Sequence, residues 1–443
     1  MVNIQYYHLA VKAVSYRASF YTLGCRLNQA ETAVISRTFQ EKGYRIVEFG
    51  EDTDLCVINT CSVTEHSEAK CRNIIRSVLR KSPQAFVAVT GCYAQIGAEN
   101  LKKIEGVDLI VGTEYKMKVA QYIQTPSKLP APVVLHTRRI SRDNFTVEAI
   151  GNHSEVTRAN LKIQDGCDFF CTFCIIPFTR GRERSRKLGD LLREAEELAR
   201  QGHKEVVLTG VNIGRYFDEG RTLLDAVKAL EGIDGIERIR ITSIEPTTIQ
   251  EDLVDYMASS PKLCPYFHVP VQSGDDKILK AMNRRYTVKD YLQFVERVVQ
   301  KVPDVGLGTD MIVGFPGEGD AEFENSRRLL EESPLNYAHV FSYSRRPGTR
   351  AAKMDSPVHP ETIKERSKIL QQLSRKKRQN FYSRYVGRTV RVLFETRNEE
   401  GIFTGLTANY IRVGAITNLD LSRQFRDVRI TEVLEDMALG TLL

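Results

Sequence analysis

The organisation of this chain is decided by one stretch, Cys167-Asp168-Phe169-Phe170-Cys171-Thr172-Phe173-Cys174. Thiolates ligate iron in cubane clusters, and three cysteines leave one of the four irons without a protein ligand. Such an iron can bind a small molecule. A zinc knuckle or three unrelated buried thiols are the alternatives, but zinc normally takes a fourth Cys or His at short range. The nearest histidines, His153 and His203, lie outside the loop, so the spacing predicts an iron–sulfur cluster.

The composition is that of a globular protein, with 42% hydrophobic and 27% charged residues in a chain of 443. No window is apolar and long enough to span a bilayer. Residues 1–19 lack the continuous apolar core of a secretory signal and are interpreted as a loose leader. Nine cysteines, an odd number without a small-domain framework, favour a reducing compartment and metal ligation. We therefore expect a cytoplasmic protein without a membrane partner.

The basic residues are concentrated in two regions. The net charge is +7 overall, +5 over residues 1–150 and +6 over residues 359–385, whereas residues 386–443 carry −1. This distribution suits a partner with phosphates, although a charge run is often only a solvated helix face.

The first third alternates strand and helix patterns, which predicts an open parallel sheet. Strands are expected at 19–23, 54–59, 86–90 and 107–111, and helices at 28–42 and 65–81. Cys25, Cys61 and Cys92 each come directly after a predicted strand. Ligands bind in the crevice at the carboxyl ends of such strands, so these thiols are candidates for a second cluster; three buried thiols are the alternative. Cys56, Cys71 and Cys264 are expected to be core thiols.

The middle of the chain, residues 154–358, contains six strand-and-helix units, which predicts a full or partial barrel with its chemistry at the C-terminal face. Strands are expected at 161–164, 205–209, 238–242, 267–271, 307–313 and 338–343. The Cys167 loop follows the first of them. Polar and glycine residues that follow the others are candidates for binding a cofactor: Gly210, Asn212, Ser243, Glu245, Gln272 and Asp310.

Two basic segments are candidates for binding a phosphate backbone. The loop after the cysteines carries Arg180, Arg182, Arg184 and Arg186, and the predicted helix 359–385 carries Arg375, Lys376 and Lys377. Beyond Gly387, short alternating strands with glycine turns predict a small antiparallel barrel.

Several motifs resemble those of the radical S-adenosylmethionine methylthiotransferases. They are Thr22–Asn28, Ile58–Cys61, Val89–Tyr93, the Cys167 stretch, Ser243–Pro246, His268–Gly274 and Ile312–Glu318. The resemblance implies five segments: an N-terminal methylthiotransferase domain (17–125), a linker (126–153), a partial (β/α)6 radical barrel (154–358), a basic connecting helix (359–385) and a TRAM-like RNA-binding barrel (386–443).

The resemblance also implies two 4Fe-4S clusters and two uses of S-adenosylmethionine. One molecule binds the open iron at Cys167, Cys171 and Cys174 and is cleaved to a 5′-deoxyadenosyl radical, which abstracts hydrogen from C2 of a modified adenine. The auxiliary cluster on Cys25, Cys61 and Cys92 presents sulfur, which a second molecule methylates. An external electron donor is required, and a monomer is expected.

Three branches of the family act on N6-threonylcarbamoyladenosine in tRNA, on N6-isopentenyladenosine in tRNA, or on an aspartate of a ribosomal protein. The stretches Asn28–Thr32, Val89–Gln95 and Ile163–Cys167 look most like the first branch, although Arg26 stands where that branch commonly has Lys. The interpretations from other classes are a radical enzyme with one cluster and a non-catalytic iron–sulfur RNA-binding protein.

Overall fold

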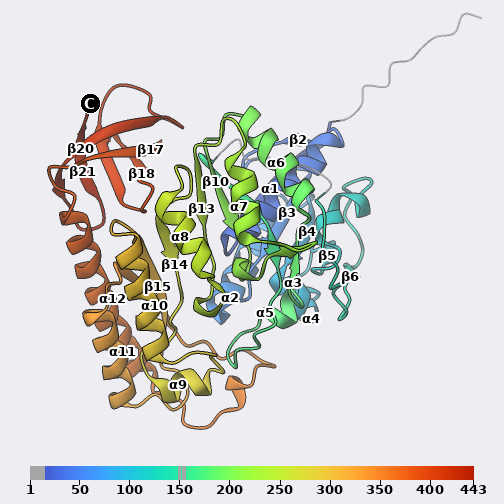
Figure 1. The fold of residues 1–443 in the computed structure, drawn as a ribbon. Coiled ribbons are helices and arrows are strands. Elements are labelled where there is room, and N and C mark those ends of the chain that lie inside the picture. Colours follow the sequence, from blue (N-terminus) through green and yellow to red (C-terminus); the bar gives the residue numbers. More distant parts are fainter. Residues whose placement is uncertain (1–14, 148–150, 152–155) are drawn as a thin grey trace, which may run out of the picture.

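The computed structural model describes residues 15–147, 151 and 156–443, which form three consecutive parts (Figure 1). Residues 1–14 of the predicted leader lie outside the described residues, and its last three residues are not a leader, because they belong to the strand β1 (Arg17–Thr22). Across the described ranges, no helix has both the length and the apolar character required to cross a membrane.

The N-terminal part is a parallel sheet of six strands in the order β2-β1-β3-β4-β5-β6. Its strands are β1 (Arg17–Thr22), β2 (Arg45–Ile46), β3 (Leu55–Thr60), β4 (Phe86–Gly91), β5 (Leu109–Val111) and β6 (Val133–Leu135). Its helices are α1 (Arg26–Glu41), α2 (Glu65–Lys81), α3 (Cys92–Ile96), α4 (Ala98–Leu101) and the 3₁₀ helix η1 (Lys116–Tyr122). The predicted open parallel sheet is confirmed, and strand β6 of the predicted linker pairs with β5.

Both faces of this sheet are covered, which explains the continuous apolar runs in β3 and β4. Val57 packs in one core cluster with Phe39 of α1. Ile58 packs in another with Ile75 of α2. Because α1 joins β1 to the edge strand β2 and the chain then returns to β3, the order of strands reverses between β1 and β3. Such a switch point creates a crevice at the carboxyl ends of the strands.

The central part has six parallel strands in two groups of three, β7-β10-β13 and β14-β15-β16. The strands are β7 (Arg158–Lys162), β10 (Glu205–Thr209), β13 (Arg238–Ile241), β14 (Tyr266–His268), β15 (Gly306–Val313) and β16 (Tyr337–Ser342). Ile239 joins the groups through backbone hydrogen bonds to Lys262 and Cys264. Strands β7 and β16 are not paired with each other, so the predicted partial barrel is open between them.

Helices cover the outer face of the six strands (Figure 1). They are α6 (Leu188–Arg200), α7 (Leu223–Glu231), α8 (Glu251–Ser259), α10 (Val288–Lys301) and α11 (Asp320–Glu332). Shorter elements lie in the loops: β8 (Gln164–Asp165), α5 (Ile176–Thr179), β9 (Arg184–Ser185), η2 (Ile213–Arg215), β11 (Phe217–Asp218), β12 (Arg221–Thr222), η3 (Pro246–Thr248), α9 (Asp276–Ala281) and η4 (Ala351–Lys353).

The long helix α12 (Pro360–Ser383) leads to a closed barrel of five strands in the order β17-β18-β19-β21-β20. These are β17 (Thr389–Arg397), β18 (Ile402–Leu406), β19 (Arg412–Ile416), β20 (Phe425–Val433) and β21 (Ala438–Leu442). The barrel is fixed to the central part, because Tyr410 stacks on Tyr266 with ring centroids 4.4 Å apart and Arg240 donates to the carbonyls of Thr407 and Ala408.

Candidate functional site

The Cys167 loop is shaped by close backbone contacts. Gly166 has φ +71°, and a Cβ there would lie 1.9 Å from the carbonyl oxygen of Arg182, so only glycine fits. The amide of Cys167 donates to the carbonyl of Gly181 over 3.1 Å, and that of Cys174 donates to Cys171 over 3.0 Å. These contacts fold the three cysteines into one compact loop after β7 and β8.

The sulfurs of this first triad, Cys167, Cys171 and Cys174, are free thiols with N–H donors beside them. The amide of Phe169 lies 3.5 Å from Cys167 Sγ, and Arg284 Nη1 lies 3.2 Å from Cys171 Sγ. Burial raises the pKa of Cys167 to about 11. Three clustered thiols with cationic and amide donors suit a negatively charged iron–sulfur cluster, because cluster binding would remove their protons.

The second triad, Cys25, Cys61 and Cys92, lies at the carboxyl edge of the N-terminal sheet. Cys25 and Cys61 follow β1 and β3, on either side of the switch point, and Cys92 follows β4. The turns are in contact, since a Cβ on Gly24 would lie 2.9 Å from Cys61 Cβ. Asn28 joins them by donating to the carbonyls of Leu23 and Thr60.

The thiolates of this triad would repel one another. Burial raises the pKa of Cys61 to about 11, and the neighbouring Cys92 and Cys25 thiolates add to that shift. Cys61 and Cys92 are buried, whereas Cys25 reaches solvent. The structure therefore brings together three cysteines that are far apart in the sequence, and their donor chemistry suits a second cluster.

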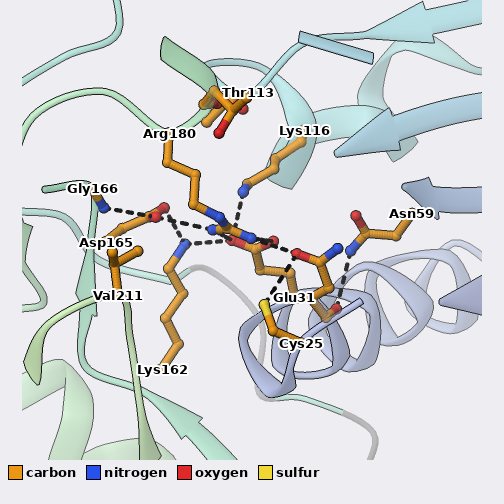
Figure 2. Close-up of polar contacts among 12 residues, drawn as sticks. Cys25, Glu31, Asn59, Thr113, Lys116, Lys162, Asp165, Gly166, Arg180 and Val211 are labelled. Carbon is orange, nitrogen blue, oxygen red and sulfur yellow. Dashed lines mark hydrogen bonds and ion pairs between the residues drawn. The ribbon is translucent and has the colours of Figure 1, made fainter. Parts of the chain in front are cut away.

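A buried ion-pair network lies beside Cys25 of the second triad and includes Asp165, two residues before Cys167 of the first triad (Figure 2). Arg180 donates to Glu31 over 3.0 Å, to Asp165 over 2.9 Å and to Asn28 over 2.5 Å. Lys162 lies 2.7 Å from both carboxylates, and Lys116 lies 2.5 Å from Glu31. Although burial opposes ionisation, Arg180, Lys116 and Lys162 hold the pKa of Glu31 well below its usual range. The network joins α1 and η1 of the first part to β7 and β8 of the second.

The predicted role of Arg180 and Arg186 in RNA binding is wrong. Each is 1% exposed, and Arg186 forms ion pairs with Asp190 and Glu194. The basic loop turns inward because β9 pairs with β8 and buried carboxylates neutralise its arginines. Arg184 is also largely buried and is paired with Asp165. Arg182 is more exposed but is paired with Asp168.

Four of the predicted cofactor-binding residues lie beside the first triad. Glu245 forms an ion pair with Arg284, which also contacts Cys171. Asn212 Oδ1 accepts from the amide of Glu245, and its buried Nδ2 has no hydrogen-bond partner in the structure. Gly210 packs on Gln164, and the non-glycine residue Ser243 has φ +50°. A strained backbone and an unpartnered buried amide are typical of a ligand site, which suits S-adenosylmethionine.

Gln272 and Asp310 lie on the other half of the barrel. Gln272, with φ +69°, bonds the backbone of β15 on both sides of Met311. Asp310 lies within β15 rather than at its end, and its Oδ1 lies 2.8 Å from His268 Nε2 and 3.3 Å from His339 Nδ1. Both residues stay predicted cofactor contacts.

The helix α12 presents part of its predicted basic surface. Arg375 and Lys376 are exposed, but Lys377 Nζ donates to the carbonyls of Glu331 and Ser333 at the end of α11. A second basic surface is a hollow of about 1220 Å³, whose lining includes Arg138, Arg139 and Arg142. These three side chains are exposed, and none is ion-paired to a described carboxylate.

The residues that sequence reasoning missed are Asn28, Glu31 and Arg284. Asn28 and Glu31 belong to the α1 stretch that carries the resemblance, and their position beside Cys25 was the available signal. Arg284 has no such signal, because 110 positions separate it from Cys174.

Cys56, Cys71 and Cys264 are 0%, 0% and 1% exposed, so the prediction that they are core thiols is confirmed.

Three family models match successive parts of the chain. The radical SAM superfamily matches residues 161–330, the uncharacterized protein family UPF0004 matches residues 17–112, and the TRAM domain matches residues 383–443. Among solved structures, a radical S-adenosylmethionine methyltransferase, TsrM, from Kitasatospora setae superposes with a TM-score of 0.53 at 14% identity, covering 76% of this chain and 77% of that one. This likeness shows a shared fold.

Curated relatives match nearly the whole chain. A threonylcarbamoyladenosine tRNA methylthiotransferase MtaB of Aquifex aeolicus is 38% identical, covering 90% of this chain and 96% of that protein. The enzyme of the same name from Bacillus subtilis is 36% identical, with 89% of each chain covered. A tRNA-2-methylthio-N(6)-dimethylallyladenosine synthase of Acetivibrio thermocellus is 34% identical, covering 93% of this chain and 88% of that protein. The chain therefore belongs to the radical S-adenosylmethionine methylthiotransferase family.

Proposed function

We propose that the chain converts N6-threonylcarbamoyladenosine next to the anticodon of tRNA into its 2-methylthio derivative. The observation that carries the proposal is the presence of two cysteine triads on two parts of the chain that one buried network, Glu31–Arg180–Asp165, joins. The relatives from Aquifex aeolicus and Bacillus subtilis, which carry the threonylcarbamoyladenosine name, support this substrate. N6-isopentenyladenosine is the second candidate, because the Acetivibrio thermocellus relative is 34% identical.

Each triad would hold one 4Fe-4S cluster, and S-adenosylmethionine would bind beside the first. When bound, these groups supply a carbon-centred radical and a sulfur to be transferred. Arg284 would hold Cys171 and Glu245 in place, and the exposed Cys25 would keep the second triad open toward the substrate. We also propose a cytoplasmic monomer that receives electrons from an external donor.

The RNA backbone would contact exposed arginines and lysines. Arg375 and Lys376 of α12 and Arg138, Arg139 and Arg142 beside the N-terminal sheet are the candidates, because they are exposed and no buried carboxylate among the described residues neutralises them. Arg375 has only the exposed Glu435 as a partner. Arg180 and Arg186 are excluded from this surface by their burial.

The proposal is tested by analysing tRNA nucleosides from a strain that lacks the gene. The 2-methylthio derivative of threonylcarbamoyladenosine should disappear and return with the wild-type gene. It should also return with C56A, which alters a core thiol, but not with C25A. An unchanged profile, or loss of the isopentenyl derivative alone, would contradict the proposed substrate.

The two-cluster proposal has a separate readout. Iron and sulfide analysis after anaerobic reconstitution should give about eight irons per wild-type chain and about four for the C25A/C61A/C92A variant. About four irons in the wild-type protein would contradict it.

A further inference from the structure

We propose that the hollow beside Cys25 is a carboxylate-binding subsite, in which Arg26 binds the threonyl carboxylate of the substrate base. The inference rests on the proposed function, because it assigns one group of that substrate to one residue. It also explains how the site distinguishes an anionic adenine substituent from an apolar one.

The hollow has a volume of about 570 Å³ and lies on the open side of the barrel. It is lined by Cys25, Arg26 and Gln29 at the start of α1, by Arg158 and Asn160 of β7, and by Glu395 of β17. A second hollow of about 330 Å³ shares Arg158 and Glu395 with the first and includes His339 of β16. The second hollow therefore lies between the unpaired edge strands β7 and β16, and the first hollow, which includes Cys25, adjoins it at Arg158 and Glu395.

Arg26 is a half-buried cation with neutral partners. Its Nη1 lies 3.4 Å from Asn160 Oδ1, and its Nη2 lies 3.2 Å from the hydroxyl of Tyr410. Within the described part of the chain, no carboxylate forms an ion pair with it. By contrast, Arg180, Arg186, Arg240 and Arg284 are each paired with a carboxylate. A guanidinium offers a planar fork that matches a carboxylate, so Arg26 is suited to an anion that arrives with the substrate.

Arg158 is a second guanidinium group beside the hollow whose N–H groups are only partly hydrogen-bonded. Its Nε lies 2.7 Å from Glu395 Oε1, but its Nη1 is buried and has no hydrogen-bond partner in the structure. Arg158 lines both hollows. The first hollow thus has two guanidinium groups and one carboxylate, which leaves an excess of positive charge for an anionic ligand.

The charge of the proposed substrate complements this excess of positive charge. A threonylcarbamoyl substituent carries a carboxylate, which would supply the counter-ion that Arg26 lacks. An isopentenyl substituent is apolar and would leave the cation uncompensated in a half-buried position, which is unfavourable. Binding of the carboxylate by Arg26 would hold the substituent beside Cys25, a member of the second triad.

The test measures binding of anticodon stem-loop RNAs to the reconstituted protein under anaerobic conditions by fluorescence anisotropy. The RNAs differ only in the adenosine next to the anticodon, which carries threonylcarbamoyl, its methyl ester or isopentenyl. The wild-type protein should bind the acid at least about tenfold more tightly than the ester, since one charge-assisted contact is lost. R26Q should remove this difference, and R26K should retain part of it. R45Q, which removes an exposed charge that lines neither hollow, should behave as the wild type.

Two results would overturn the inference, and they are distinguishable. If R26Q preserves the wild-type ratio between acid and ester while the strain analysis still shows threonylcarbamoyladenosine as the substrate, only the subsite fails. If the wild-type protein prefers the isopentenyl RNA and methylthiolates it alone, the subsite and the proposed substrate fail together.

Discussion

At Glu31, one buried carboxylate faces three cations, and the balance of charge predicts a large effect of substitution. E31Q should lower the free energy of unfolding by about 3–5 kcal/mol, because Arg180, Lys116 and Lys162 would lose their shared counter-ion in a buried site. Denaturant unfolding of the apoprotein measures this. E41Q on the same helix removes an exposed partner of Arg37 and should cost less than about 1 kcal/mol. Equal effects of the two variants would contradict the importance of the network.

The same carboxylates predict that the folded protein loses stability in acid. Although burial opposes ionisation, Lys162 and Arg180 hold the pKa of Asp165 well below its usual range, and Arg180 and Lys116 do the same for Glu31. The unfolded chain therefore binds more protons than the folded one once the pH falls below about 4.5, so stability falls from there downward. Urea midpoints between pH 5 and pH 3 should drop steeply in the wild type and less steeply in E31Q. Parallel slopes would contradict this explanation.

Arg284 should tune the cluster at the first triad. R284Q removes a positive charge and a hydrogen bond to Cys171 Sγ, so the midpoint potential should fall, on the order of tens of millivolts. A redox titration followed by electron paramagnetic resonance, in a C25A/C61A/C92A background, isolates this cluster. R297Q is the matched control, since Arg297 of α10 is exposed and pairs with Glu251, outside the cysteine loop. A potential unchanged by R284Q would show that the contact has no electrostatic effect.

At the residue scale, the grouping of the cysteines was predictable and their neighbours were not. Spacing predicted that Cys167, Cys171 and Cys174 lie together, and strand position predicted the same for Cys25, Cys61 and Cys92; their role as cluster ligands stays a prediction. Arg180 was wrongly assigned to an RNA-binding surface, because the sequence of an arginine-rich loop does not show whether its side chains face solvent or buried carboxylates. The partner Glu31 is 149 positions away, and local sequence does not encode a pairing over that distance.

At the scale of elements, α12 carries both a structural charge and charges that are candidates for binding RNA. Lys377 holds the C-terminal carbonyls of α11, and burial lowers its pKa to about 8. K377M should lower the free energy of unfolding by about 1 kcal/mol and leave RNA affinity unchanged. K376E on the exposed face should weaken tRNA binding and alter the salt slope of log Kd by about 1. Loss of RNA affinity in K377M, with K376E unaffected, would reverse these assignments.

Most helices and strands were predictable from the hydrophobic periodicity of the sequence, and the exceptions have physical reasons. The predicted strand 205–209 and helix 65–81 match β10 and α2 at both ends. The closing strand β21 was missed, because its residues Ala438–Leu442 lack the alternation of a half-buried strand. It is stabilised by a hairpin with β20 and by parallel pairing with β19, and the pairing with β19 is non-local. Strand pairing of this kind appears only once the barrel is assembled.

At the scale of the whole molecule, the order of parts was predictable but their docking was not. Composition, strand–helix alternation and motifs predicted an open sheet, a partial barrel and a small terminal barrel. The hollow beside Cys25 arises where α1, β7 and β17 meet, so no single segment indicates it. The position of the terminal barrel therefore decides the shape of the proposed substrate site.

Gly306 provides a test of that docking. It begins β15, and a Cβ there would lie 2.2 Å from the backbone oxygen of Asn409, next to Tyr410. Asn409 cannot yield easily, because its side chain donates to the carbonyl of Asp304 and to the hydroxyl of Tyr385. G306A should therefore displace the terminal barrel and lower the free energy of unfolding by about 1–3 kcal/mol, as overpacking does.

The displacement should have a specific signature. Because the barrel supplies Glu395 and Tyr410 to the hollows, G306A should weaken tRNA binding and expose the junction after α12 to limited proteolysis, while iron content stays at the wild-type value. G189A is the matched control, since an added Cβ there meets no atom within 4 Å. If G306A and G189A give the same proteolytic pattern and the same RNA affinity, the barrel is free to move, and the substrate site cannot depend on its position.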